Sequence, residues 1–201
     1  MECAEGLLRG GLPVEALVRE GLTAALRLLD PKCTNEEFNL LEIMLAGRAL
    51  MAVLDEVLGF YLPSASLVDA IPEKTIVVGT IRGDIHEFGK HIVRMLFRAS
   101  GYRVIDLGKD VAPHDFVKEA VIEDAGYIGV SSLITLTIPS IKEIRNILAK
   151  VDLQSIRVIA GGAAIQQATA KELNVDFVAK DPFEALRYLE RTCINSTLPF
   201  R

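Results

Sequence analysis

Cysteine is scarce in this chain, and its placement argues against a structural role. The 201 residues include three cysteines, Cys3, Cys33 and Cys193, which lie far apart and form no Cys-x-x-Cys pair. An odd number without close spacing disfavours a disulfide framework and a zinc site built on thiolates. We therefore expect a protein that works in a reducing cytoplasm.

A membrane-spanning run and a basic surface are also missing. No apolar run approaches the roughly 20 residues that cross a bilayer, and the N-terminus lacks the positive start of a signal peptide. The net charge is −5, with −7 on residues 1–73 and +2 on residues 74–201. No stripe of lysine and arginine results, so we expect binding to neither membrane nor nucleic acid.

Several common catalytic and nucleotide-binding motifs are absent as well. The chain contains neither Gly-x-Gly-x-x-Gly nor a P-loop, which disfavours ordinary dinucleotide or triphosphate binding. No arrangement of serine, histidine and aspartate, or of cysteine and histidine, stands out for nucleophilic catalysis.

The first third of the chain has the periodicity of helices. Apolar residues recur at helical spacing from Val14 to Leu29, with Pro13 in the expected first turn. The run 34–37 matches a capping box for a second helix that ends near Gly59. We predict an all-α helical cap domain over residues 1–72 and a linker at 71–74.

From residue 75 onward, short strands alternate with helices. The predicted strands are β-branched runs at Thr75–Thr80, Arg103–Leu107, Tyr127–Ser131, Arg157–Ala160 and Asp176–Ala179. The predicted helices lie near residues 89–100, 113–124, 138–150, 163–173 and 182–192, and prolines mark three of their starts. This alternation predicts an α/β domain over residues 75–201, a five-stranded parallel flavodoxin-like or Rossmann-like sheet of order 2-1-3-4-5.

This topology brings three segments to one edge of the sheet. Ligands of such sheets bind outside the carboxyl ends of the strands, where the strand order reverses. Gly83–Gly89 follows the first strand, Ser131–Thr137 follows the third, and Gly161-Gly162 follows the fourth. We expect these three segments to form one site between the first and third strands.

Within these segments, His86 is the strongest candidate for a metal ligand. A lone histidine is usually an ordinary loop residue, but this one follows a strand and has Asp84 two positions before it and Gly89 three positions after it. A metal-bound imidazole generally has its other nitrogen held by a carboxylate or carbonyl. Neither His91 nor His114 completes a zinc site, so one histidine without co-ligands fits a metal already held in a macrocycle.

Each of the other two segments has a purely structural and a functional interpretation. Threonines at a strand end can reflect β-propensity, or Ser131, Thr135 and Thr137 could bind a polar ligand. Gly161 and Gly162 could form a bare strand-to-helix turn, or a surface against which a flat group presses.

Taken together, the motifs Asp84-x-His86-x-x-Gly89, Ser131-x-Leu133 and Gly161-Gly162 resemble the signature of cobalamin-binding domains. The similarity extends to corrinoid proteins of methyltransferase systems and to the cobalamin module of methionine synthase. It covers residues 75–192 well. The N-terminal part more loosely resembles the helical bundle that caps the corrin in these proteins, with Tyr61, Leu62 and Leu67 as guesses for its contacts.

The resemblance implies a role for each motif residue. His86 would replace the cofactor's own base as the lower cobalt ligand, the base-off/His-on form, with Asp84 hydrogen-bonded to it. Thr137 would be the third member of this relay. The remaining implied cofactor-binding residues are Gly89 and Leu133 of the motifs, Ser131 and Thr135 at the nucleotide tail, and Gly161 and Gly162 along the tail channel.

The resemblance also implies a function, that of a methyl carrier without catalysis of its own. Such a corrinoid protein accepts a methyl group on Co(I) from a donor:corrinoid methyltransferase. It passes the group as methyl-Co(III) to a second methyltransferase, whose acceptor is coenzyme M or tetrahydrofolate. A reductive activase is a further partner. Methanol, methylamines and methoxylated aromatics are all open as donors.

Three other functions stay open. The first is a cobalamin-dependent sensor, which the lack of tryptophan and of a DNA-binding extension disfavours. The second is the cobalamin subunit of a mutase, which would need a substrate barrel on another chain. The third is a flavodoxin-like domain for a different ligand.

Overall fold

The computed structural model describes residues 2–22, 45–46, 49, 52–53 and 74–196. The chain divides into two compact units, Met1–Ser64 and Ala65–Arg201. The predicted capping box at 34–37 and the predicted domain boundary at 72–75 fall wholly or largely outside the described residues, and both stay predictions. No helix in the described ranges is long and apolar enough to span a membrane.

The described start of the first unit is helical, as predicted. It consists of α1 (Glu2–Arg9), α2 (Val14–Ala16) and the π-helix η1 (Leu17–Leu22). Pro13 lies one position earlier than expected, because it is the extended N-cap of α2 and not a residue of its first turn. Its fixed φ of −60° suits both positions.

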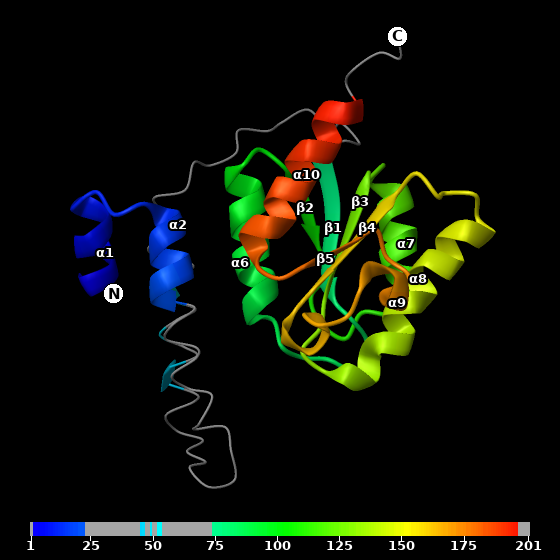
Figure 1. The fold of residues 1–201 in the computed structure, drawn as a ribbon, viewed down its shortest axis with the longest axis horizontal. Coiled ribbons are helices and arrows are strands. Elements are labelled where there is room, and N and C mark those ends of the chain that lie inside the picture. Colours follow the sequence, from blue (N-terminus) through cyan, green and yellow to red (C-terminus); the bar gives the residue numbers. More distant parts are fainter. Residues whose placement is uncertain (1, 23–44, 47–48, 50–51, 54–73, 197–201) are drawn as a thin grey trace, which may run out of the picture. The chain divides into compact units, whose positions relative to one another are not determined.

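The second unit contains the predicted five-stranded parallel sheet (Figure 1). Its strands are β1 (Thr75–Thr80), β2 (Arg103–Asp106), β3 (Tyr127–Ser131), β4 (Arg157–Gly161) and β5 (Phe177–Ala179). The order is β2-β1-β3-β4-β5, which confirms the prediction. All six residues of β1 are buried, as expected for an inner strand of a sheet covered on both faces.

Helices cover both faces of this sheet. They are α6 (Phe88–Ala99), α7 (Pro113–Ile122), α8 (Ile138–Lys150), α9 (Ala170–Leu173) and α10 (Pro182–Ser196), with 3₁₀ turns η5 (Thr135–Thr137) and η6 (Ala163–Ile165). In Figure 1, α6 and α10 lie on one side and α7 and α8 on the other. Alternate strand residues supply the two cores, Val77 to the α7/α8 side and Ile76 to the α6/α10 side.

One predicted helix is wrong in its extent. The run 163–173 is not a single helix but the turn η6 followed by the separate helix α9. The break has a local cause at Thr169, whose hydroxyl accepts the backbone N–H of Glu172 while the Glu172 carboxylate accepts the N–H of Thr169. This capping box starts a new helix at Ala170.

The carboxyl ends of three strands are in register. Thr80 of β1 pairs with Ser131 of β3, and Ser131 pairs with Gly161 of β4. The loops that follow β1, β3 and β4 therefore leave the sheet side by side. This arrangement confirms that the three predicted segments converge at the point where the strand order reverses.

Candidate functional site

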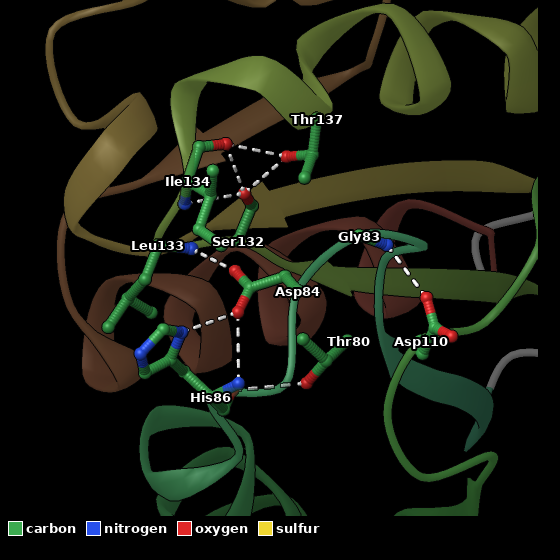
Figure 2. A network of polar contacts seen from close by, with 9 residues as sticks. All are labelled: Thr80, Gly83, Asp84, His86, Asp110, Ser132, Leu133, Ile134 and Thr137. Atoms are coloured by element: carbon green, nitrogen blue, oxygen red, sulfur yellow. Dashed lines mark hydrogen bonds and ion pairs between the residues drawn. The ribbon is translucent and has the colours of Figure 1, made fainter.

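His86 lies in the loop between β1 and α6, and its ring is held by Asp84 (Figure 2). The ring nitrogen Nδ1 lies 2.7 Å from Asp84 Oδ1, and the backbone N–H of His86 donates to the same oxygen at 2.9 Å. The Thr80 hydroxyl donates to the His86 carbonyl at 3.2 Å. The His86 side chain is 53% exposed while that of Asp84 is fully buried, so a solvent-facing imidazole rests on a buried carboxylate.

Asp84 also joins two loops that are far apart in sequence. Its second oxygen, Oδ2, accepts the backbone N–H of Leu133 at 2.5 Å, in the loop after β3. Burial alone would raise the pKa of the Asp84 carboxyl, but the N–H groups of Leu133 and His86 and the His86 ring together hold this pKa below its ordinary value. Asp84 is therefore an anion at neutral pH.

An ionised Asp84 determines which nitrogen of His86 carries the proton. A carboxylate without a proton only accepts hydrogen bonds, so Nδ1 of His86 must be the donor in the 2.7 Å contact. In the neutral ring, Nε2 then carries a free lone pair. Among the described residues, Nε2 has no hydrogen-bond partner, and this nitrogen can bind a metal ion.

The third predicted member of the relay bonds elsewhere. The Thr137 hydroxyl lies 2.6 Å from the Ser132 hydroxyl and donates to the Ile134 carbonyl at 2.7 Å. Within the part of the chain that the structure describes, no hydrogen bond joins Thr137 to Asp84, so the relay predicted through Thr137 is not formed here. Ser132 and Thr137 are both buried and brace the turn that presents Leu133.

Ser132 is a site residue that sequence reasoning missed. It follows Ser131 in the same hydroxyl-rich run, and the motif Ser131-x-Leu133 passes over it. Both neighbours are more accessible, Ser131 half-buried and Leu133 40% exposed, while Ser132 itself is fully buried. A buried hydroxyl whose partners are Ile134 and Thr137 can be recognised only once η5 is placed.

The two glycines at the end of β4, Gly161 and Gly162, differ in whether the fold itself requires a glycine. Gly162 has φ +125°, and a Cβ atom there would overlap the carbonyl oxygen of Ser132, so the turn alone demands a glycine. At Gly161 a Cβ would meet the Ala179 carbonyl at 3.6 Å, an ordinary contact, and at Gly89 it would meet nothing. Backbone packing thus accounts for Gly162 and leaves Gly161 and Gly89 unexplained by protein contacts.

Three exposed apolar side chains stand on the two segments that Asp84 joins. Ile85 is 66% exposed, Leu133 40% and Leu136 88%. Leu133 lies beside the His86 ring in Figure 2, and the predicted tail contacts Ser131 and Thr135 stand on the same segment, half-buried and exposed. A free ring nitrogen beside exposed apolar side chains suits a large, mostly apolar ligand that carries its own metal.

The remaining histidines stand apart from this pair. His91 lies in α6, and His114 in α7 contacts Asp115 at 3.1 Å. Among the described residues, no three histidine, cysteine or acidic side chains gather as a metal site. The proposed upper-face residues Tyr61, Leu62 and Leu67 lie outside the described residues.

We expect His91 to make stability depend on pH. Its Nδ1 is buried without a partner among the described residues, and burial, with Arg94 and Lys90 nearby, lowers its pKa against the opposing pull of Glu87 and Asp106. In the unfolded chain the pKa of histidine is about 6.5. The unfolded state therefore binds the proton first as pH falls, and folding becomes less favourable below that pH.

The variant His91→Gln should weaken this dependence. Urea unfolding measured from about pH 7.5 to about pH 5 would give a shallower loss of stability in the variant than in the wild type. Parallel curves for the two proteins would contradict the expectation.

Comparison with known proteins gives consistent matches. Residues 74–187 match the family described as the B12 binding domain. The chain is 32% identical over 181 residues to dimethylamine corrinoid protein 3 of Methanosarcina acetivorans, covering 89% of this chain and 82% of that protein.

Two solved structures share the fold. The monomethylamine corrinoid protein of Methanosarcina barkeri aligns with a TM-score of 0.81 at 23% identity, over 94% of this chain and 89% of the other. A methanol:cobalamin methyltransferase complex from the same organism aligns with a TM-score of 0.58 at 22% identity, over 89% and 67%.

Proposed function

Because this chain belongs to the B12-binding domain family, we propose that it is a corrinoid carrier that moves methyl groups between two methyltransferases. The observation that carries this proposal is the pair of His86 and Asp84, in which a buried carboxylate holds Nδ1 and leaves Nε2 exposed. The named relatives, which are corrinoid proteins, support it.

The residues of the site fit a cobalamin in its base-off/His-on form. A bound corrinoid would supply a cobalt centre that can accept and give up a methyl group. In this proposal Nε2 of His86 would bind the cobalt, and the exposed Ile85, Leu133 and Leu136 would offer apolar contacts to the corrin. Such contacts would limit the access of water to the metal ligand.

The nucleotide tail would pass along the ends of β3 and β4. Ser131 and Thr135 offer hydroxyls there. Gly161 offers a surface without a side chain, which no protein contact demands. Gly89 leaves similar open space at the start of α6.

Asp84 would hold the His86 ring both when Nε2 binds metal and when it does not. While Nε2 binds metal, the carboxylate fixes the ring through Nδ1. Without metal on Nε2, the same carboxylate, 2.7 Å from Nδ1, would still hold the ring and would stabilise a positive charge on it.

The partners in this proposal are two methyltransferases and a reductive activase. The name of a dimethylamine corrinoid relative and the methanol:cobalamin methyltransferase complex both support methyltransferases as partners. Methylamines are the first donors to test, because the sequence matches a dimethylamine corrinoid protein over 89% of this chain. Coenzyme M and tetrahydrofolate are the acceptors to compare.

A transfer experiment tests the carrier role. Protein loaded with cobalamin and reduced would be offered isotope-labelled dimethylamine together with the methyltransferases encoded near its gene. We expect the label on the corrinoid extracted from the protein, and its loss when the second methyltransferase and coenzyme M or tetrahydrofolate are added. A loaded protein that no donor and methyltransferase can label would contradict the carrier role and favour a sensor.

A further inference from the structure

Lys90 is a buried cation at the carboxyl edge of the sheet. It lies in the first turn of α6, and its side chain is 2% exposed. Its Nζ is 2.5 Å from Asp106 Oδ1 and 3.1 Å from Glu87 Oε1. Lysine is almost never fully buried unless its charge is paired, so these two carboxylates explain why Lys90 is tolerated inside.

The two carboxylates belong to different parts of the edge. Glu87 directly follows His86 and is the N-cap of α6. Asp106 is the last residue of β2, and its Oδ1 also accepts the backbone N–H of Gly108 at 2.9 Å. Gly108 in turn accepts the N–H of Thr80 at the end of β1. Lys90 therefore ties the residue after His86 to a point fixed on the sheet.

His86 is in this way restrained from both sides. Asp84 and Thr80 hold its ring, its N–H and its carbonyl, but neither holds the chain beyond it. Lys90 restrains the chain after His86 through its ion pair with Glu87. An ion pair shielded from water resists exchange with solvent more than an exposed one.

A second cation near Glu87 provides an internal comparison. Lys109 lies 3.8 Å from Glu87 Oε2, and its side chain is 55% exposed. An exposed pair at this separation contributes little. Of these two lysines, Lys90 alone is both buried and bonded to the end of β2.

We propose that Lys90 is a positioning residue that presets the His86 loop for cobalt ligation. It touches neither ligand nor metal and acts through Glu87. The proposal rests on the proposed function, in which Nε2 of His86 binds cobalt. Without the Lys90–Glu87 tie the loop samples other positions, and His86 competes less well with water and with the cofactor's own base.

The test compares three variants loaded with cobalamin. Lys90→Met removes the cation. Glu87→Ala removes the carboxylate that both lysines contact and leaves Lys90 paired with Asp106, so it decides the matter if Lys90→Met does not fold. Lys109→Met is the matched control, since it removes the exposed cation from the same carboxylate.

The readouts are cobalamin affinity and the fraction of bound cobalamin that is His-on, from absorption and electron paramagnetic resonance spectra. We expect Lys90→Met and Glu87→Ala to lose about tenfold in affinity, within the range for residues that orient a metal ligand, and to show a lower His-on fraction at full occupancy. Lys109→Met should match the wild type. A purely structural role would lower stability without changing the spectrum of the bound fraction.

Each outcome bears on a different claim. If Glu87→Ala and any folded Lys90→Met keep the affinity and spectrum of the wild type, the positioning role is wrong and the proposed function stands. If the wild type itself shows no His-on spectrum, the proposed function fails and this inference fails with it.

Discussion

Replacing His86 by alanine is expected to remove the lower cobalt ligand while leaving the fold intact. The side chain is 53% exposed, so little packing is lost, and the backbone N–H at position 86 still bonds Asp84. Loss of a metal ligand should cost at least as much as loss of the residue that orients it, about 10-fold to 100-fold in affinity. The absorption spectrum should shift from His-on to base-off, and methyl transfer should fall.

The matched control is His114→Ala. That histidine is exposed on α7 and contacts Asp115, far along the chain from the site loop. Its removal should leave the spectrum and the cobalamin affinity unchanged. An unaltered axial nitrogen signal in His86→Ala would refute ligation by His86.

Replacing Gly162 by alanine is expected to destabilise the protein severely, with or without a cofactor. The added Cβ would overlap the Ser132 carbonyl, and φ is +125°. The obstacle is backbone, which cannot rotate away as a flexible side chain can. A loss on the order of 3 kcal/mol or more in the free energy of unfolding follows, measurable by urea unfolding of the cofactor-free protein.

Gly161→Ala separates folding from binding at the adjacent position. A Cβ there meets the Ala179 carbonyl at an ordinary 3.6 Å, so the cost in stability should stay below roughly 1 kcal/mol. If Gly161 lines the tail channel, this variant should nevertheless bind cobalamin more weakly. Equal stability losses at the two positions would contradict the distinction drawn between them.

Much of the second unit follows from local pattern. The β-branched runs are short, and the prolines at 113, 139 and 182 mark helix starts, so five strands, their order and the edge that carries the site are all predictable. The pair of Asp84 and His86 is equally visible, because two residues at a strand end contact each other locally. Local pattern made the elements and the pair predictable, and the general topology of doubly wound sheets made the strand order predictable.

What was missed depends on contacts between distant segments or on competing local signals. Lys90 looks like an ordinary surface lysine until β2 brings Asp106 beside it. Thr137 was expected to reach Asp84, but the turn η5 gives its hydroxyl nearer partners in Ser132 and Ile134. The helix at 163–173 was broken by a second start signal at Thr169, which outweighs the helical spacing around it.

The hydrogen bond between Asp84 and Leu133 also determines when, during synthesis of the chain, the site can form. Its two residues are 49 positions apart in sequence. The carboxylate therefore has all of its hydrogen bonds only after β3 has been synthesised and has paired with β1. A nascent chain that has emerged only as far as α6 holds His86 but not the clamp that orders its carboxylate. In the proposed function, cofactor loading would therefore follow closure of the sheet, because only then does Leu133 hold the carboxylate that fixes the His86 ring.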